Sequence, residues 1–128
     1  MFILPDDFDV DDFRGKFLSE VGLGIGTISL NFDSAGGPGS SKPAHVTMHA
    51  MFEFAFDGGV KAGYASDPIT AAGLSRFLNQ DVLDFCSDTD FALRIGFGEV
   101  GEIRIPQEGS WESFSIRVAG RDTIDSSG

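Results

Sequence analysis

The stretch that decides the fold is FALRIGFGEVGEIRIPQEGSWESFSIRV, which runs from Phe91 to Val118. Apolar residues alternate with others at its start, glycines turn the chain near its middle, and a second alternating segment follows. A third alternation comes after the Trp-Glu-Ser-Phe sequence. Because successive side chains of a strand point to opposite faces, the first strand presents one apolar face. The stretch predicts a hairpin and a third strand, and its densest apolar face consists of Phe91, Leu93, Ile95 and Phe97.

The segment from His45 to Phe56 has the longest alternation in the chain and is predicted to be the central strand. Its even-numbered positions are apolar: Val46, Met48, Ala50, Phe52, Phe54 and Phe56. The opposite face carries His45, His49 and Glu53, which would face a ligand if the domain held one between helix and sheet. Residues four apart on a strand are separated by about 13 Å, whereas zinc lies about 2 Å from its ligands. We therefore predict no metal site in this row.

Glycine and proline mark the other elements. Glycines at positions 22, 24 and 26 predict a hairpin over residues 17–32, and Asp57-Gly58-Gly59 predicts a turn into a strand over residues 60–65. Ser66-Asp67-Pro68 predicts the start of a helix, because aspartate caps helices and proline is tolerated in their first turn. The helix is expected to end near Asn79. Its predicted apolar stripe consists of Leu74, Phe77 and Leu78, with Ile69 and Ala72 near its start.

These elements predict one α+β domain over residues 1–128. We expect a strongly curved antiparallel sheet of about six to eight strands, with one helix near residues 68–79 packed on one face. Two segments are expected to lie outside this framework. They are an acidic N-terminal segment over residues 1–14 and a flexible loop of glycine, serine and proline over residues 34–43.

Composition limits the class of protein. Of the 128 residues, 41% are hydrophobic and 23% are charged, a balance that argues against disorder. Thirteen phenylalanines against one tyrosine and one tryptophan indicate a core built on phenylalanine. Twenty acidic residues against nine basic ones give a formal charge of -11, which repels nucleic acid and anionic lipid. We therefore expect a protein partner of basic character, although such acidity also serves solubility.

The single cysteine, Cys86, cannot form an internal disulfide, and no basic segment followed by an apolar segment opens the chain. No apolar run approaches the roughly 20 residues that span a bilayer. These features predict a soluble protein of a reducing cytoplasm. Cys86 has no cationic or histidine neighbour in the sequence, so a packing role is favoured over a nucleophilic one.

The acidic N-terminal segment combines aspartates with apolar rings. Five aspartates precede the first basic residue, Arg14, and phenylalanines are interleaved with them. One interpretation is a docking arm; the other is a segment that packs on the fold through its rings and leaves its carboxylates in water. The residues that a docking arm would use are Asp7, Asp9, Asp11 and Asp12.

The sequence contains near-matches to known motifs but no complete one. A dinucleotide-binding motif would need glycine at Thr27, a phosphate loop would need a hydroxyl residue at Pro43, and a calcium loop would need glycine at Asp12. No G-x-S-x-G motif occurs. We predict no catalytic residue and no cofactor. The acids around the last hairpin are interpreted as solvated turn residues: Glu99, Glu102, Glu108 and Glu112.

The pattern from Leu74 to Arg117 resembles a group of small uncharacterised bacterial proteins. It reads as a capped helix ending in Phe-Leu, a short strand, Leu-x-Ile-x-Phe-Gly, Ile-x-Ile-Pro and Trp-Glu-Ser-Phe-x-Ile. Some of those proteins are encoded beside polymorphic toxin genes and are regarded as immunity proteins. Their helix tends to end in glycine and their turn often reads Asp-Gly, where this chain has Asn79 and Gly98-Glu99. The resemblance implies an α+β fold with no established enzymatic activity.

Two functional hypotheses follow from the sequence. The leading one is a non-enzymatic, immunity-type domain whose acidic surface binds a basic partner by charge complementarity, with Trp111 and Glu112 as further interaction residues. The alternative is a small-ligand-binding domain or small enzyme with a pocket between helix and sheet, which His45, His49 and Glu53 would face. A purely structural accessory domain is a third interpretation.

Overall fold

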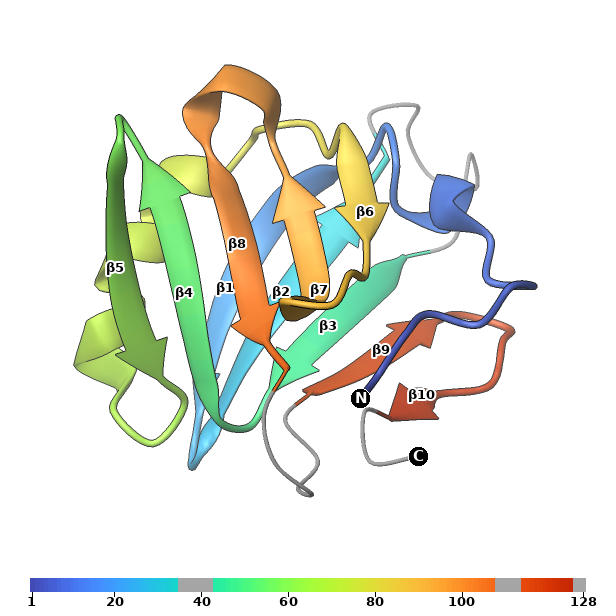
Figure 1. Ribbon diagram of the computed structural model, residues 1–128, viewed down its shortest axis with the longest axis horizontal. Helices are drawn as coiled ribbons and strands as arrows, with labels where there is room; N and C mark the ends of the chain where they lie inside the picture. Colours follow the sequence, from blue (N-terminus) through green and yellow to red (C-terminus); the bar gives the residue numbers. More distant parts are fainter. Residues whose placement is uncertain (35–42, 108–113, 126–128) are drawn as a thin grey trace.

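The computed structural model describes residues 1–34, 43–107 and 114–125. These residues form two five-stranded antiparallel sheets, which face each other as two layers (Figure 1). The strands of sheet A are β1 (Phe17–Gly24), β2 (Thr27–Asp33), β3 (Ala44–Met48), β9 (Phe114–Val118) and β10 (Ile124–Asp125). The strands of sheet B are β4 (Met51–Phe56), β5 (Gly59–Tyr64), β6 (Asp84–Cys86), β7 (Phe91–Gly96) and β8 (Glu102–Pro106).

Sheet A has the strand order β1-β2-β3-β9-β10, and sheet B has the order β5-β4-β8-β7-β6. The described residues also form three 3₁₀ helices: η1 (Val10–Asp12) before β1, η2 (Pro68–Phe77) between β5 and β6, and η3 (Gly98–Val100) between β7 and β8. The prediction of an antiparallel fold with one helix of several turns is therefore confirmed. The prediction of one curved sheet is wrong, because the strands are divided between two sheets.

The predicted central strand is the point where the division occurs. Residues 45–56 form two strands, β3 and β4, and the chain crosses from sheet A to sheet B at His49 and Ala50. Met48 and Phe52 are both fully buried on the two sides of this crossing. Most even-numbered positions of both strands are buried, but Ala50, which was predicted on the same apolar face, is exposed at the crossing. No glycine or proline marks the crossing, which is why alternation alone predicts one strand.

The hairpin predicted at the start of the fold-deciding stretch is confirmed as β7 and β8, whereas β9 belongs to the opposite sheet. Leu93, Ile95 and Phe97 are buried as predicted. Phe91 is only half-buried, because the pairing register shifts between Phe91 and Leu93. The hairpins β1–β2 and β4–β5 are also confirmed.

The core lies between the two sheets and is built largely on phenylalanine, as the composition predicts. Rings from both sheets and from the connecting segments are completely buried. These rings belong to Phe13, Phe32, Phe52, Phe77 and Phe114. Full burial of one such ring contributes roughly 1.5–3 kcal/mol relative to an exposed ring. The interior is therefore the main source of stability, and the candidate sites lie on the outside of the two layers.

The helix η2 begins as predicted, with the Asp67 carboxylate accepting from the Ile69 N–H at 3.3 Å. It ends at Phe77, and Asn79 adopts the positive φ of 66° that was expected near the helix end. The predicted stripe is wrong in part. Ala71, Leu74 and Phe77 are buried, while Ile69 is 83% exposed. A 3₁₀ helix has three residues per turn, so side chains three apart lie in line, whereas an α-helical period was assumed.

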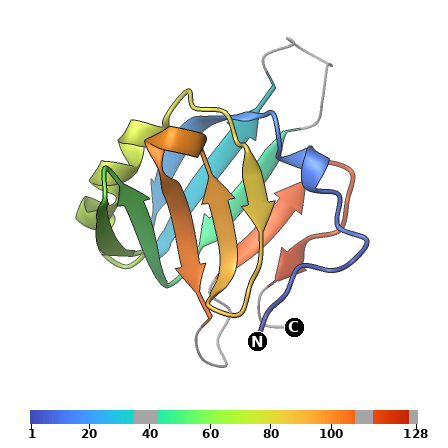
Figure 2. The ribbon, with the colours of Figure 1, turned by 45° about the horizontal axis from the view of Figure 1, so that its top comes forward.

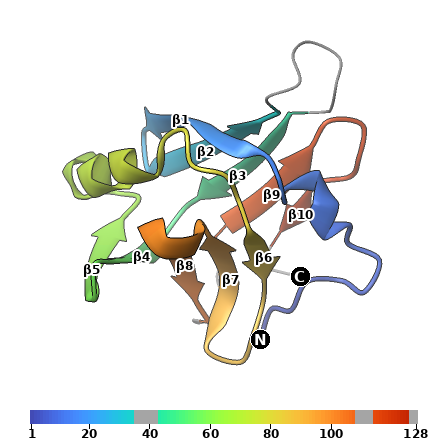
Figure 3. The ribbon, with the colours of Figure 1, turned by 90° about the horizontal axis from the view of Figure 1, so that it is seen from above.

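The helix and the N-terminal segment lie at opposite sides of the two layers (Figure 2). The helix η2 lies next to β1 and β5, where it closes one open side of the sandwich instead of covering the face of a sheet (Figure 3). The segment around η1 lies near β6 and closes the other side. Phe13 stacks on Phe85 with ring centroids 4.1 Å apart, and Phe8 stacks on Phe85 at 5.5 Å. The prediction that this segment packs through its rings is confirmed.

Candidate functional site

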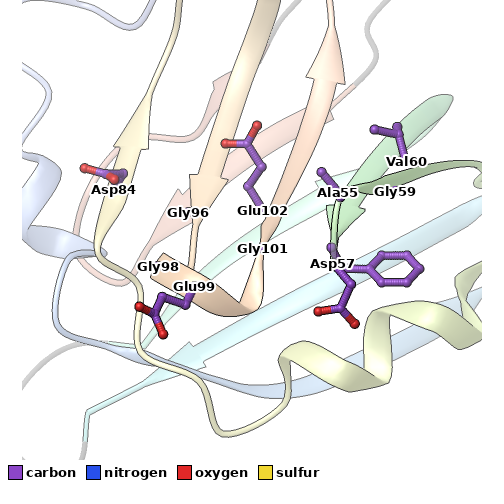
Figure 4. Close-up of a pocket in the computed structure, with 12 residues that line it drawn as sticks. Ala55, Asp57, Gly59, Val60, Asp84, Gly96, Gly98, Glu99, Gly101 and Glu102 are labelled. Atoms are coloured by element: carbon purple, nitrogen blue, oxygen red, sulfur yellow. The ribbon is translucent and has the colours of Figure 1, made fainter.

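The outer face of sheet B contains a groove whose walls come from all five strands (Figure 4). One cross-strand row forms its base, since the pairing register places Val60, Ala55, Glu102, Gly96 and Asp84 side by side across β5, β4, β8, β7 and β6. Two members of this row have small or no side chains. They leave a hollow of about 490 Å³ around Glu102. This volume is within the range of small-molecule and side-chain pockets, about 300–1,000 Å³.

Glycines shape the end of this groove. The turn between β7 and β8 passes through Gly98, with φ of 67°, and Gly101, with φ of 134°, both of which are conformations that favour glycine. A Cβ atom at Gly101 would lie 2.0 Å from the Ala55 carbonyl oxygen. Glycine therefore allows β8 to start directly against β4. This close approach brings the η3 turn and its Glu99 side chain to the groove.

The charged groups that line the groove are all acidic. They are Asp57, Asp84, Glu99 and Glu102. Glu102 is neutralised, because its Oε1 atom lies 3.1 Å from Arg94 Nη1 and 3.3 Å from Arg104 Nη1. The other three carboxylates form no ion pair with any residue in the described ranges. The groove therefore presents a concentration of uncompensated negative charge.

The next row of the same face is a network of ion pairs. Arg94 and Arg104 are directly opposite each other on β7 and β8, an arrangement that is unfavourable unless anions separate the charges. Glu53 Oε1 accepts from Arg104 Nη2 at 2.9 Å, and Asp88 Oδ2 lies 2.7 Å from Arg94 Nε. Both guanidinium groups also lie 4.7 Å from the centre of the Phe91 ring. This network fixes the wall of the groove and pairs both arginines with carboxylates of the same chain.

Two titrating groups beside this network have shifted pKa values. The Phe91 N–H, which donates to the Asp88 carboxylate at 2.8 Å, lowers the pKa of Asp88, and the Asp90 N–H and Arg94 act in the same direction. Burial raises the pKa of the Cys86 thiol above its ordinary value of 9.0, an effect that Arg94 opposes. Cys86 is therefore a neutral thiol near neutral pH, which is the poorly nucleophilic form.

The three residues of the alternative hypothesis are separated by the fold. His45 lies on β3 in sheet A, His49 lies at the crossing between the sheets, and Glu53 lies on β4 in sheet B. His45 Nδ1 lies 2.5 Å from Asn31 Oδ1, and Glu53 is paired with Arg104. In the part of the chain that the structure describes, no three histidine, cysteine or acidic side chains form a group that could hold a metal ion.

The aspartates of the N-terminal segment have mostly structural contacts. Asp9 caps η1 by accepting from the Asp11 N–H at 3.0 Å, and Asp11 lies 3.7 Å from Arg14. Asp12 Oδ2 lies 2.6 Å from Arg121 Nε, which ties this segment to the turn after β9. Asp7 has no such contact with another described residue. Trp111 and Glu112 lie outside the described residues.

The sequence predicts Glu99 and Glu102 at a turn but does not associate them with Asp57 and Asp84. Their positions are distant in the sequence, and only the register of β4, β8, β7 and β6 brings them together. The available signal was the density of glycine in both turns, at Asp57-Gly58-Gly59 and from Gly96 to Gly101. Glycine at a sheet surface often marks a site of close backbone approach.

The fold and the groove together define a two-layer antiparallel protein with an acidic outer face. No protein-family model, curated protein or solved structure matches the chain. Among residues 1–34, 43–107 and 114–125, no helix has the length and apolar character needed to span a membrane.

Proposed function

We propose that this chain is a non-enzymatic protein-interaction domain, of immunity type, that binds a basic protein through the acidic groove of sheet B. The observation that carries the proposal is the set of three carboxylates, Asp57, Asp84 and Glu99, that line the groove and form no ion pair with a described residue. The formal charge of -11 and the resemblance of residues 74–117 to immunity-like proteins support the same conclusion.

The physical basis of binding is electrostatic complementarity. A lysine or arginine side chain of the partner would enter the groove and pair with the lining carboxylates that form no ion pair with a described residue, Asp57, Asp84 and Glu99. Acidic charge over the surrounding surface would steer the partner and raise the association rate. Because exposed charges are screened by salt, binding of this kind weakens as ionic strength rises.

The test uses the protein encoded next to this chain in its genome as the probe, produced in recombinant form. The variant D57N/D84N/E99Q removes the three free carboxylates, and D6N/D33N/D122N removes the same charge from exposed sites elsewhere. We expect the groove variant to weaken binding by about tenfold or more and the control variant to have a much smaller effect. Equal losses in the two variants, or an affinity that does not change with salt, would contradict the proposal.

A further inference from the structure

A second groove lies between β1 and the helix η2, two elements that lie next to each other in Figure 3. Its volume is about 400 Å³. Its lining is mostly apolar and consists of Ser19, Glu20, Val21, Leu23, Pro68, Ala71, Ala72, Ser75 and Leu78. Leu23 is 60% exposed even though it belongs to a strand. The groove is therefore an apolar surface that the described part of the chain leaves uncovered.

The strand β1 lies at the edge of sheet A. Along the edge that faces away from β2, only the first residues of β1 form backbone hydrogen bonds with described residues. The Leu18 N–H donates to the Gln80 carbonyl at 3.2 Å, and the Asn79 N–H donates to the Leu18 carbonyl at 2.8 Å. Beyond Leu18, no described residue pairs with this edge. An edge of this kind presents unpaired N–H and C=O groups to an incoming strand.

The register shows which residues supply these groups. The β1–β2 hairpin closes at the pair Gly24 and Thr27 around a two-residue turn, and such a closing pair is hydrogen-bonded. Hydrogen-bonded pairs alternate with pairs whose backbone groups point away from the partner strand. Val21 and Leu23 are members of the alternate pairs, so their N–H and C=O groups point to the free edge.

The side chains of the same two residues point toward the groove. Val21 is paired with Leu30 and Leu23 with Ile28, and both partners are completely buried on the inner face of sheet A. Paired residues project from the same face of a sheet. Val21 and Leu23 therefore continue the inner, apolar face beyond the core, over the small residues of η2.

The outer face of the edge has a different character. Glu20, Asn31 and His45 form one cross-strand row, in which Asn31 Nδ2 donates to Glu20 Oε1 at 2.7 Å. Glu20 ends this row and is exposed. It is also the only charged residue that lines the groove, as far as the described residues show. A residue placed next to Glu20 by a further strand would therefore be most favourable as a cation.

We propose that the β1 edge binds an extended segment of a protein partner, which adds a strand to sheet A. The segment has alternating character: apolar side chains enter the groove beside Val21 and Leu23, and a lysine or arginine lies beside Glu20. Main-chain hydrogen bonds to the edge supply affinity, and the alternation supplies specificity. A second copy of this chain is a poorer occupant, because each copy carries a formal charge of -11. This site is separate from the acidic groove of sheet B.

The probe is a fluorescent synthetic peptide that alternates valine and lysine, and its binding is measured by anisotropy. A second peptide has the same side chains but carries N-methyl groups on the backbone nitrogens of one edge, so that it cannot pair with β1. We expect the first peptide to bind, with slowed amide exchange at Val21 and Leu23, and the methylated peptide to bind at least about tenfold more weakly. Equal binding of both peptides would overturn the proposal.

Variants locate the site on the protein. A72L fills the groove and is expected to weaken peptide binding by about tenfold, while A62L, the same change at an exposed position of β5, leaves it unchanged. E20Q is expected to weaken binding of the valine-lysine peptide. A valine-glutamate peptide that binds equally well would overturn the basic character of the partner. If the wild-type protein forms a dimer in the absence of peptide and the A72L variant is a monomer, the groove binds a second copy of the chain, and the choice of occupant is overturned.

The variant D57N/D84N/E99Q distinguishes this inference from the proposed function. Its substitutions lie on the outer face of sheet B and leave the β1 edge intact. We expect it to bind the valine-lysine peptide like the wild type, apart from the general effect of three lost charges, which D6N/D33N/D122N measures. A loss of peptide binding in D57N/D84N/E99Q but not in D6N/D33N/D122N would place the peptide in the acidic groove and overturn the assignment to β1.

Discussion

The two open sides of this sandwich are closed in different ways. On the side of β6, the N-terminal segment inserts Phe13, which is completely buried and stacks on Phe85 at 4.1 Å. On the side of β1, the helix η2 presents Ala71, Ala72 and Ser75, and a groove of about 400 Å³ remains. Both sides face the same core, so the difference comes from the residues that cover it.

The two sides differ in the volume of the side chains that cover them: Phe13 fills the space on the side of β6, which we call the sealed side, whereas Ala71, Ala72 and Ser75 leave the groove beside η2 on the open side. Large rings fill the space between two twisted sheets, and close packing of this kind leaves few voids. A 3₁₀ helix of small residues holds the layers together through a single line of buried side chains, Ala71, Leu74 and Phe77, and leaves its flank open. We therefore expect Phe13 on the sealed side to contribute strongly to stability and the exposed flank of η2 on the open side to tolerate change.

Phe13→Ala is expected to have the largest effect. Truncation of a completely buried phenylalanine costs about 3–5 kcal/mol, because the burial is lost and a cavity remains. Chemical denaturation followed by circular dichroism measures the loss. The control is Ile69→Ala on the open side, where the side chain is 83% exposed and the change is expected to stay within about 0.5 kcal/mol. Similar losses at both positions would remove the difference between the two sides.

Gly73→Ala tests where η2 is in close contact with the core. A Cβ atom at Gly73 would lie 2.5 Å from Phe54 Cζ, and the Phe54 ring is buried and stacked on Phe52. Overpacking of this kind outweighs the better helix propensity of alanine, so we expect a net loss of about 1–2 kcal/mol. Ser75→Ala, at the groove, is the control and should be nearly neutral in the same denaturation measurement. A stabilised Gly73→Ala variant would show that η2 is loosely packed along its whole length.

The local elements of this fold could be predicted from the sequence, and their arrangement could not. The hairpin of β7 and β8 depends on alternation and a glycine turn between neighbours in the chain, and both are visible in the sequence. The crossing at His49 and Ala50 depends on which strands pair across the molecule. An alternating segment has the same pattern whether it stays in one sheet or continues into a second.

The candidate site could not be predicted either, because it too depends on pairing between strands that are distant in the sequence. Glu99 and Glu102 were visible as acids at a turn, but Asp57 and Asp84 join them only through pairing between strands that are distant in the sequence. The helix stripe was predicted with a period of about 3.6 residues, and the observed period of three moved burial from Ala72 to Ala71. Propensity does not separate these two helix types in a short segment.

Lys16→Met tests the electrostatics of the sealed side. Lys16 is 5% exposed, its Nζ donates to the Asp12 carbonyl, and burial lowers its pKa, although Asp12 opposes the shift. At pH values between the lowered pKa of folded Lys16 and the ordinary value of 10.5, this lysine holds more protons in the unfolded chain than in the folded protein. Its contribution to the free energy of unfolding therefore rises with pH in this window. Methionine removes that contribution but also the hydrogen bond, so the net change at neutral pH should stay within about 1 kcal/mol.

The measurement for Lys16 is the difference in unfolding free energy between wild type and variant over the alkaline range. We expect the difference to shift in favour of the wild type as pH rises through this window. Lys61→Met, at an exposed position of β5, is the control for the loss of one positive charge. A difference that moves in the opposite direction would show that the charged form of Lys16 is favoured in the folded protein.

Ala72→Leu is expected to have the smallest effect on stability, although it changes the open side of the sandwich directly. Ala72 lies at the groove and is exposed, so a larger side chain has space and covers apolar surface. We expect a change within about 0.5 kcal/mol in denaturation, with Ala62→Leu as the matched control. A loss well above that value would show that Ala72 is already packed and that the groove is not open. If filling the groove leaves stability unchanged while it prevents peptide binding, the small residues of η2 serve binding rather than folding.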